Sequence, residues 1–158
     1  MSSASNSVSS ISWNQAALFC NWLSLNEGFS PFYLVEESIV VGVNENSIGY
    51  RLPSEAEWEF VAKYANKRSP TIFTWGDDYE VGDQAGNIAD ASAADIAVRN
   101  IATYNDGHKN VASSGSYARE ASGMYDLSGN LSEFTKSNYP HLGGYIWAIF
   151  WKISFLNY

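Results

Sequence analysis

The feature that most limits the fold of this chain is a long stretch without regular periodicity. Between residues 71 and 138, Gly, Asn, Asp, Ser and Tyr dominate, and apolar residues show little helical spacing. Irregular segments of that length are uncommon in one domain unless something organises them, because backbone N–H and C=O groups need partners. We therefore expect a loop-rich fold, and a bound ion is one physical way to hold the loops in place.

Charge and cysteine content narrow the classes of function. The 158 residues carry a net charge of −8, which argues against a nucleic-acid partner. Surplus carboxylates are compatible with cation binding, although a solvated acidic surface is the commoner reason for them. The only cysteine, Cys20, excludes an internal disulfide and any metal site built on a cysteine pair.

Neither end of the chain predicts a membrane segment. Residues 1–8 lack the basic and apolar regions of a signal peptide. The apolar tail 145–158 is shorter than the roughly 20 residues that a membrane-spanning helix needs, and it contains Lys152. We expect no membrane span, and the compartment is left unassigned.

The first 28 residues predict a capped helix. Ser12 is an N-cap candidate, and Gln15 completes a capping box three residues later. Gly28 is placed to end the helix. One face is predicted to be apolar at helical spacing and to hold the cysteine as a small core residue: Ala16, Phe19, Cys20 and Leu23.

Short strands and a second helix are expected next. Residues 32–35 and 39–41 are β-rich, and residues 44–47 have turn composition. Ser54 then opens a helix, with Glu57 as its capping-box partner. The stripe predicted to face the core is Trp58, Val61, Ala62 and Ala65, with Glu59 and Lys63 paired on the exposed side.

Two groups of acidic and amide residues could bind a cation. The first joins residues 87–88 with residues 105–108, and the second is the segment 126–133. Calcium takes six to eight oxygen ligands from carboxylates, amides and backbone carbonyls. Turns held by Asn and Asp side chains explain the same composition about equally well.

Three motifs in order resemble one family. They are G-Y-R-L-P-S-E-A-E-W-E-F at 49–60, F-T-W-G-D at 73–77, and G-M-Y-D-L-S-G-N-L-S-E-F at 123–134. These motifs resemble the formylglycine-generating enzyme (sulfatase-modifying factor) family. The resemblance covers about 8–139, whereas the tail 140–158 looks unlike the family. We therefore expect residues 1–158 to be a single, incomplete domain of this kind.

The resemblance implies both a fold and a set of metal ligands. The fold would be α+β and C-type-lectin-like: two helices, small antiparallel sheets and long irregular loops organised by two structural calcium ions. Carried over by position, the calcium ligands would be Asn87, Ile88, Asp106 and His108 at one site, and Asp126, Gly129, Leu131 and Glu133 at the other. Of these, Ile88, His108, Gly129 and Leu131 would contribute only carbonyl oxygens.

Catalysis is a separate question. Active members of the family oxidise a sulfatase cysteine to formylglycine at copper held by two cysteines, and the resemblance shows no such pair here. The resemblance therefore leaves two functions open. One is a calcium-stabilised, lectin-like scaffold without catalysis that binds a protein or a small ligand. The other is a formylglycine-generating oxidoreductase acting on a sulfatase polypeptide, of which this chain would be an incomplete copy.

Overall fold

The computed structural model describes residues 7–97 and 99–136. These residues fall into two units, each with its own internal contacts. We call residues 9–58 with 133–136 the hairpin unit, and residues 7–8 with 59–97 and 99–132 the loop unit. The tail 140–158, which the sequence singles out as divergent, lies outside the described residues.

Helix α1, Trp13–Asn26, begins and ends where its capping signals predict. The Ser12 hydroxyl accepts a hydrogen bond from the Gln15 N–H, and the Ser12 N–H donates to the Gln15 side chain. Beyond the last turn, Gly28 adopts a φ of +80°. Phe29 N–H then donates to Ser24 O at 2.8 Å, which satisfies one carbonyl of the last turn.

The predicted apolar face of α1 is wrong in part. Phe19 is 58% exposed and stacks on Trp22 at the surface, with ring centroids 5.4 Å apart. Cys20 packs at the margin of the core, and burial raises the pKa of its thiol. Hydrophobicity misplaced the buried face because two of the residues on it are polar. The buried residues of α1 are Trp13, Ala17, Asn21 and Ser24.

The two expected strands are present as β1, Tyr33–Glu36, and β2, Ile39–Val43, with bounds that lie within two residues of those expected. They pair with each other in antiparallel orientation. Glu37 and Ser38 connect them with φ angles of 47° and 68°. Positive φ at both central residues defines the type I′ turn, which suits the twist of a hairpin. The turn expected at residues 44–47 follows β2, where Ser47 N–H donates to Asn44 O at 2.9 Å.

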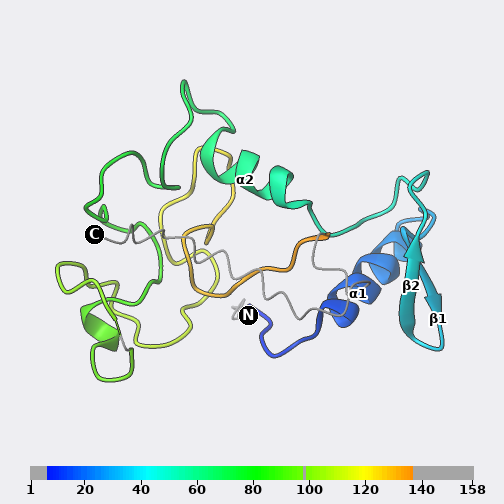
Figure 1. Cartoon of the computed structure of the whole chain (residues 1–158), viewed down its shortest axis with the longest axis horizontal. Coiled ribbons are helices and arrows are strands. Elements are labelled where there is room, and N and C mark those ends of the chain that lie inside the picture. The colour runs from blue at the N-terminus through cyan, green and yellow to red at the C-terminus, as the bar shows by residue number, and fades with distance from the viewer. Residues whose placement is uncertain (1–6, 98, 137–158) are drawn as a thin grey trace, which may run out of the picture. The chain divides into compact units, whose positions relative to one another are not determined.

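The core of the hairpin unit lies between α1 and the hairpin, which run beside each other in Figure 1. Tyr33 is at its centre, edge-on to Trp13 at 5.5 Å and to Phe32 at 5.1 Å between centroids. The Tyr33 hydroxyl accepts from Leu52 N–H at 3.1 Å. This one side chain therefore ties helix, strand and the following loop together.

Helix α2, Glu55–Lys63, confirms the second capping box. Ser54 N–H donates to the Glu57 carboxylate at 2.7 Å, and Glu57 N–H donates to the Ser54 hydroxyl at 3.2 Å. Lys63 and Glu59 form the expected pair at 2.9 Å. Of the predicted core stripe, Ala62 is buried and the other three residues are partly buried.

The loop unit has little regular structure after α2, as the composition predicts. Between residues 64 and 132 the described chain contains the short 3₁₀ helix η1, Ala91–Ala93, and isolated bridges from Phe73 to Gly76 and from Asp90 to Ile101. The fold of the described residues is thus α+β with long irregular loops. No helix in residues 7–97 or 99–136 combines the length and apolarity needed to cross a membrane.

Candidate functional site

The first predicted cluster is assembled around the Asp106 carboxylate. One of its oxygens accepts from Ile88 N–H at 3.0 Å, and the other accepts from His108 N–H at 2.6 Å. The Asp106 N–H itself donates to a carboxylate oxygen of Asp90, which is 0% exposed. Residues 18 positions apart in the chain are therefore held together by carboxylates that bind backbone N–H groups.

Asp90 also receives the Ser92 N–H and hydroxyl, at 2.8 and 2.6 Å. Desolvation by burial would raise the pKa of this carboxyl. The hydrogen bonds from Ser92 and Asp106 outweigh that effect and lower the pKa. The carboxyl is therefore held ionised, and it anchors η1 to the segment that carries Asp106.

His108 contacts the cluster through its ring as well as its backbone. Its Nδ1 lies 3.1 Å from Asp106 O and 3.1 Å from the Tyr117 hydroxyl. Tyr117 is buried, and burial together with the negative charge of Asp106 raises its pKa above the ordinary value. Nδ1 of the imidazole is thus engaged by neighbours, and the predicted ligand set uses the His108 carbonyl rather than the ring.

The two predicted clusters meet at Asn87. Its Nδ2 donates to Asn110 O at 2.7 Å and to the Asn130 side-chain oxygen at 3.1 Å. The Asn130 N–H donates back to Asn87 O at 2.8 Å. Asn130 in turn binds both peptide groups of Ala112 through its side chain. Asn130 therefore joins three segments of the loop unit.

Backbone packing at this junction requires a glycine. Gly129 has a φ of +130°, and a Cβ there would lie 2.1 Å from Asn87 O. No other residue fits both the conformation and the space. The segments that carry the two clusters are therefore in direct backbone contact, which neither cluster's spacing predicts.

Asp126, in the second cluster, has a carboxylate oxygen with unmet bonding capacity. Its Oδ2 accepts from Gly115 N–H at 2.8 Å. Its Oδ1 is buried and has no hydrogen-bond partner among the residues that the structure describes. The residue also adopts a φ of +61°, in the left-handed region. A buried carboxylate oxygen without a partner is costly, so this site favours an added cation or donor.

The remaining predicted ligands are divided between the units. Gly129 and Leu131 belong to the loop unit, whereas Glu133 belongs to the hairpin unit. Gly129 O accepts from Leu131 N–H at 2.9 Å. The structure therefore brings together the four residues of the first predicted site, and places Asp126, Gly129 and Leu131 in one unit.

The residue types fit calcium better than a transition metal. In the described part of the chain, no three His, Cys, Asp or Glu side chains converge on one point. A site here must therefore use amide and carbonyl oxygens besides carboxylates, which is the ligand set of calcium. The unpartnered Asp126 Oδ1 is the atom that fits this requirement most directly.

Copper does not fit the residues present. A copper centre of the family's kind needs a thiolate pair. This chain has one cysteine, half-buried on α1 against the core of the hairpin unit. No catalytic step through copper can be written with these side chains.

Sequence reasoning missed two residues that build the site. Asn130 lies within the second predicted cluster, but no ligand role singled it out. Asp90 lies outside both clusters, and an Asp two residues before a Ser is too common a pattern to reveal it. Their roles depend on partners 16 to 43 residues away in the chain.

Comparisons with known proteins agree with the motifs. The profile of the sulfatase-modifying factor enzyme 1-like domain matches residues 2–149. The chaperone protein LppX of Paenibacillus barcinonensis is 25% identical over 149 residues, which cover 85% of this chain and 52% of that protein.

Two solved structures share the fold. The crystal structure of CarF superposes with a TM-score of 0.58 and 24% identity over 84% of this chain and 49% of that one. Treponema denticola variable protein 1 gives a TM-score of 0.54 and 22% identity over 83% and 49%. This chain spans about half the length of these relatives. Because the family profile covers most of its residues, the chain belongs to the sulfatase-modifying factor (formylglycine-generating enzyme) family and has the α+β fold of that family.

Proposed function

We propose that this chain is a non-catalytic member of its family: a calcium-stabilised, lectin-like scaffold whose loops bind a protein or a small ligand. The observation that carries the proposal is the Asp126 carboxylate, whose Oδ1 is buried without a partner among the described residues. It lies in a loop unit held by side-chain contacts to backbone rather than by regular structure.

Calcium would act there as a structural ligand. Asp126, with the carbonyls of Gly129 and Leu131 and the carboxylate of Glu133, would hold one ion. The Asn87 and Asp106 side chains, with the carbonyls of Ile88 and His108, would hold the other. Bound calcium would neutralise the carboxylates of the two ligand sets and cross-link loops, and it would supply no reaction chemistry.

The relative named as a chaperone supports a polypeptide partner. A chaperone must contact another chain, and loops carried on a stable scaffold are suited to that task. The acidic net charge of −8 favours a partner surface that is neutral or basic.

Thermal unfolding with millimolar calcium and with a chelator tests the scaffold. A ligand that binds only the folded state at 100 times its Kd adds about 2.7 kcal/mol, so the melting temperature rises by several degrees. Glu133→Ala should reduce the rise. Asp78→Ala, an exposed carboxylate outside both sets, is the matched control. A melting temperature that is the same with calcium and with the chelator would overturn the proposal.

The second candidate is the oxidoreductase that generates formylglycine, acting as part of a longer polypeptide. Family membership favours it. Incubating a polypeptide that extends this chain to the length of its relatives with copper, oxygen and a peptide carrying a sulfatase-type cysteine tests it directly. Mass spectrometry would detect the aldehyde, and unchanged peptide would count against the enzyme.

A further inference from the structure

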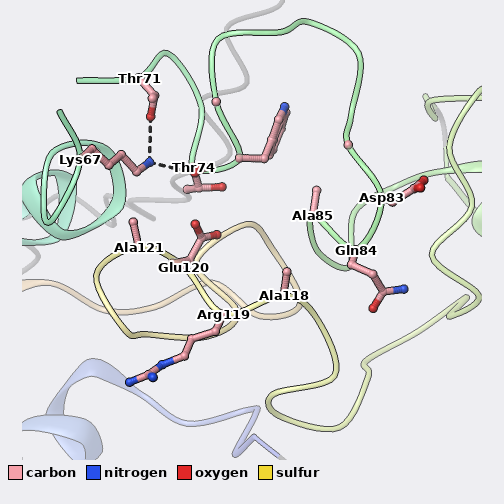
Figure 2. A pocket seen from close by; sticks show the side chains of 13 residues that line it. Lys67, Thr71, Thr74, Asp83, Gln84, Ala85, Ala118, Arg119, Glu120 and Ala121 are labelled. Carbon is pink, nitrogen blue, oxygen red and sulfur yellow. Dashed lines mark hydrogen bonds between the residues drawn. The ribbon is translucent and has the colours of Figure 1, made fainter. Parts of the chain in front are cut away.

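The loop unit contains a cavity that none of the predicted calcium ligands lines. It has a volume of about 430 Å³ and lies between residues 67–76, 82–85 and 118–121 (Figure 2). That volume suits a small organic ligand or one long side chain. Its walls combine one aromatic ring with several polar groups.

The basic side chains of the cavity are already engaged. Lys67 Nζ donates to Ala62 O at 2.9 Å, and to the Thr71 hydroxyl and Thr74 O at 2.8 Å each. These three bonds use all the N–H groups of an ammonium. Arg119 donates through Nε to Gly123 O at 2.9 Å, and its guanidinium points away from the cavity in Figure 2. A ligand in the cavity therefore finds few free donors.

The acidic side chains, by contrast, keep free acceptor capacity. Glu120 is half-buried, and its carboxyl is directed into the space beside Thr74 and Ala121 (Figure 2). The carboxylate accepts from the Ser128 hydroxyl at 3.2 Å and from the Thr74 hydroxyl, and these two bonds leave lone pairs that can accept from a ligand. Among the described residues it forms no ion pair. Asp83 adds a second, exposed carboxylate to the rim.

Burial raises the pKa of the Glu120 carboxyl, while the Ser128 hydrogen bond, the charge of Lys67 and the Thr74 hydrogen bond oppose that rise. A bound cation would relieve the cost of desolvating this carboxylate.

Trp75 supplies a fixed aromatic wall. Its indole N–H donates to Asp78 O at 3.1 Å, and its ring stacks on Phe73 with centroids 4.7 Å apart and planes 2° from parallel. Because the hydrogen bond and the stacking contact already fix the ring, it loses little conformational freedom when a ligand packs against it. Cations are attracted to such rings by the electrostatic field of the π system.

We propose that this cavity binds a primary ammonium group, with Glu120 as its counter-ion and Trp75 as its aromatic wall. The net charge of −8 would concentrate cations near the chain. The inference rests on the proposed scaffold function and gives its ligand a chemical class. Two sources share this chemistry: a free alkylamine, and the lysine side chain of a partner protein.

Titration of the full chain with n-butylamine tests the proposal, followed by calorimetry and by NMR of the Trp75 indole N–H. n-Butanol has the same shape without the charge, and n-butyrate reverses the charge. Saturable binding of the amine, with little binding of the alcohol or the acid, is expected. Equal binding of butylamine and butanol would overturn the ammonium assignment.

Three variants locate the site. Glu120→Gln should weaken amine binding about tenfold or more, because a charge-assisted hydrogen bond is lost. Glu80→Gln, an exposed carboxylate outside the cavity, should bind as the unaltered chain does. Ala118→Leu fills the cavity from an exposed position and leaves Glu120 in place, so it should abolish amine binding. Amine binding that survives both cavity variants, with unfolding curves unchanged, would overturn the proposal.

A peptide containing one lysine, compared with the same peptide containing norleucine, separates the two sources. Tighter binding of the lysine peptide than of butylamine indicates a protein partner, and the reverse order indicates a free amine. Titrations with calcium and with a chelator keep the two proposals distinguishable. If the chain binds the amine but its melting temperature does not change with calcium, only the calcium scaffold is overturned. If calcium raises the melting temperature but the amine does not bind, only the proposed ammonium site in the cavity is overturned.

Discussion

The Asn21 side chain binds both peptide groups of Tyr33. Its Nδ2 donates to Tyr33 O at 2.7 Å, and its Oδ1 accepts from Tyr33 N–H at 3.0 Å. Both residues are buried. The amide thus acts as a neighbouring strand would and attaches β1 to α1, which explains how a polar residue occupies the buried face of the helix.

Replacing Asn21 by Ala should therefore be costly. Two buried hydrogen bonds are lost and a backbone N–H and C=O are left without partners, so we expect a loss of about 2–4 kcal/mol in the free energy of unfolding. Urea denaturation measures it. Asn14→Ala is the matched control, since Asn14 makes the same kind of paired contacts, to Ser38 O and Val40 N–H, at a more exposed position. Equal losses in the two variants would contradict the role of burial.

Removal of the first capping box should cost less. Ser12→Ala loses the bond from Gln15 N–H and should destabilise the chain by about 1 kcal/mol. Ser9→Ala, an exposed serine outside the helix, should leave the urea midpoint unchanged. If Ser12→Ala behaves like Ser9→Ala, the cap contributes nothing measurable.

The effect of Asp126→Asn on stability should depend on whether calcium is present. Without calcium, the amide removes the charge from a site with an unpartnered oxygen and can still accept from Gly115 N–H, so stability should hold or rise. With calcium, the unaltered chain should gain more stability than the variant, because a carboxylate binds the ion more strongly. Thermal melts in both conditions measure the difference. An identical calcium shift in both chains would remove Asp126 from the ligand set.

The Glu120 carboxyl should make stability depend on pH. Burial raises its pKa in the folded state, with Ser128 and Lys67 opposing, and Asp83 and Arg119 are the other charged residues that line its cavity. The folded chain then holds this proton more tightly than the unfolded chain does. Its contribution to stability therefore falls as pH rises from the ordinary value of 4.5 through the raised pKa.

Glu120→Gln should abolish that fall, so the variant should gain stability relative to the unaltered chain between about pH 4 and pH 7. Urea midpoints across that range measure the difference. Glu80→Gln serves again as the control. A constant difference between the Glu120 variant and the unaltered chain across the range would contradict a raised pKa.

Local signals predicted the regular elements well. Both capping boxes, the glycine after α1, the β-rich runs and the loop-rich second half depend on residues within a few positions of each other. The Glu37–Ser38 turn was not predicted, because neither residue type favours positive φ and the hairpin imposes it. The α1 stripe was misplaced because hydrophobicity does not reveal that an amide has a buried partner 12 residues away.

The candidate site divides in the same way. The motifs identified the family, and several of the residues they contain lie in the candidate site. The assignment of these residues as calcium ligands stays a prediction. The contact between Asn87 and Asn130, 43 residues apart, could not be read from either segment alone. Nor could the cavity at Glu120, whose walls come from three separate segments.

By itself, the sequence determined which family this chain belongs to, where its helices begin, and that its loops carry oxygen-rich side chains. Those properties reside in residue identity and short-range spacing. Only the tertiary structure decided that Asn21 is buried, that Gly129 lies against Asn87, that Asp126 Oδ1 lacks a hydrogen-bond partner among the described residues, and that Glu120 lines a cavity. The physical reason is that burial and hydrogen-bond partners arise when distant segments meet, and no local pattern encodes which groups will then lack a partner.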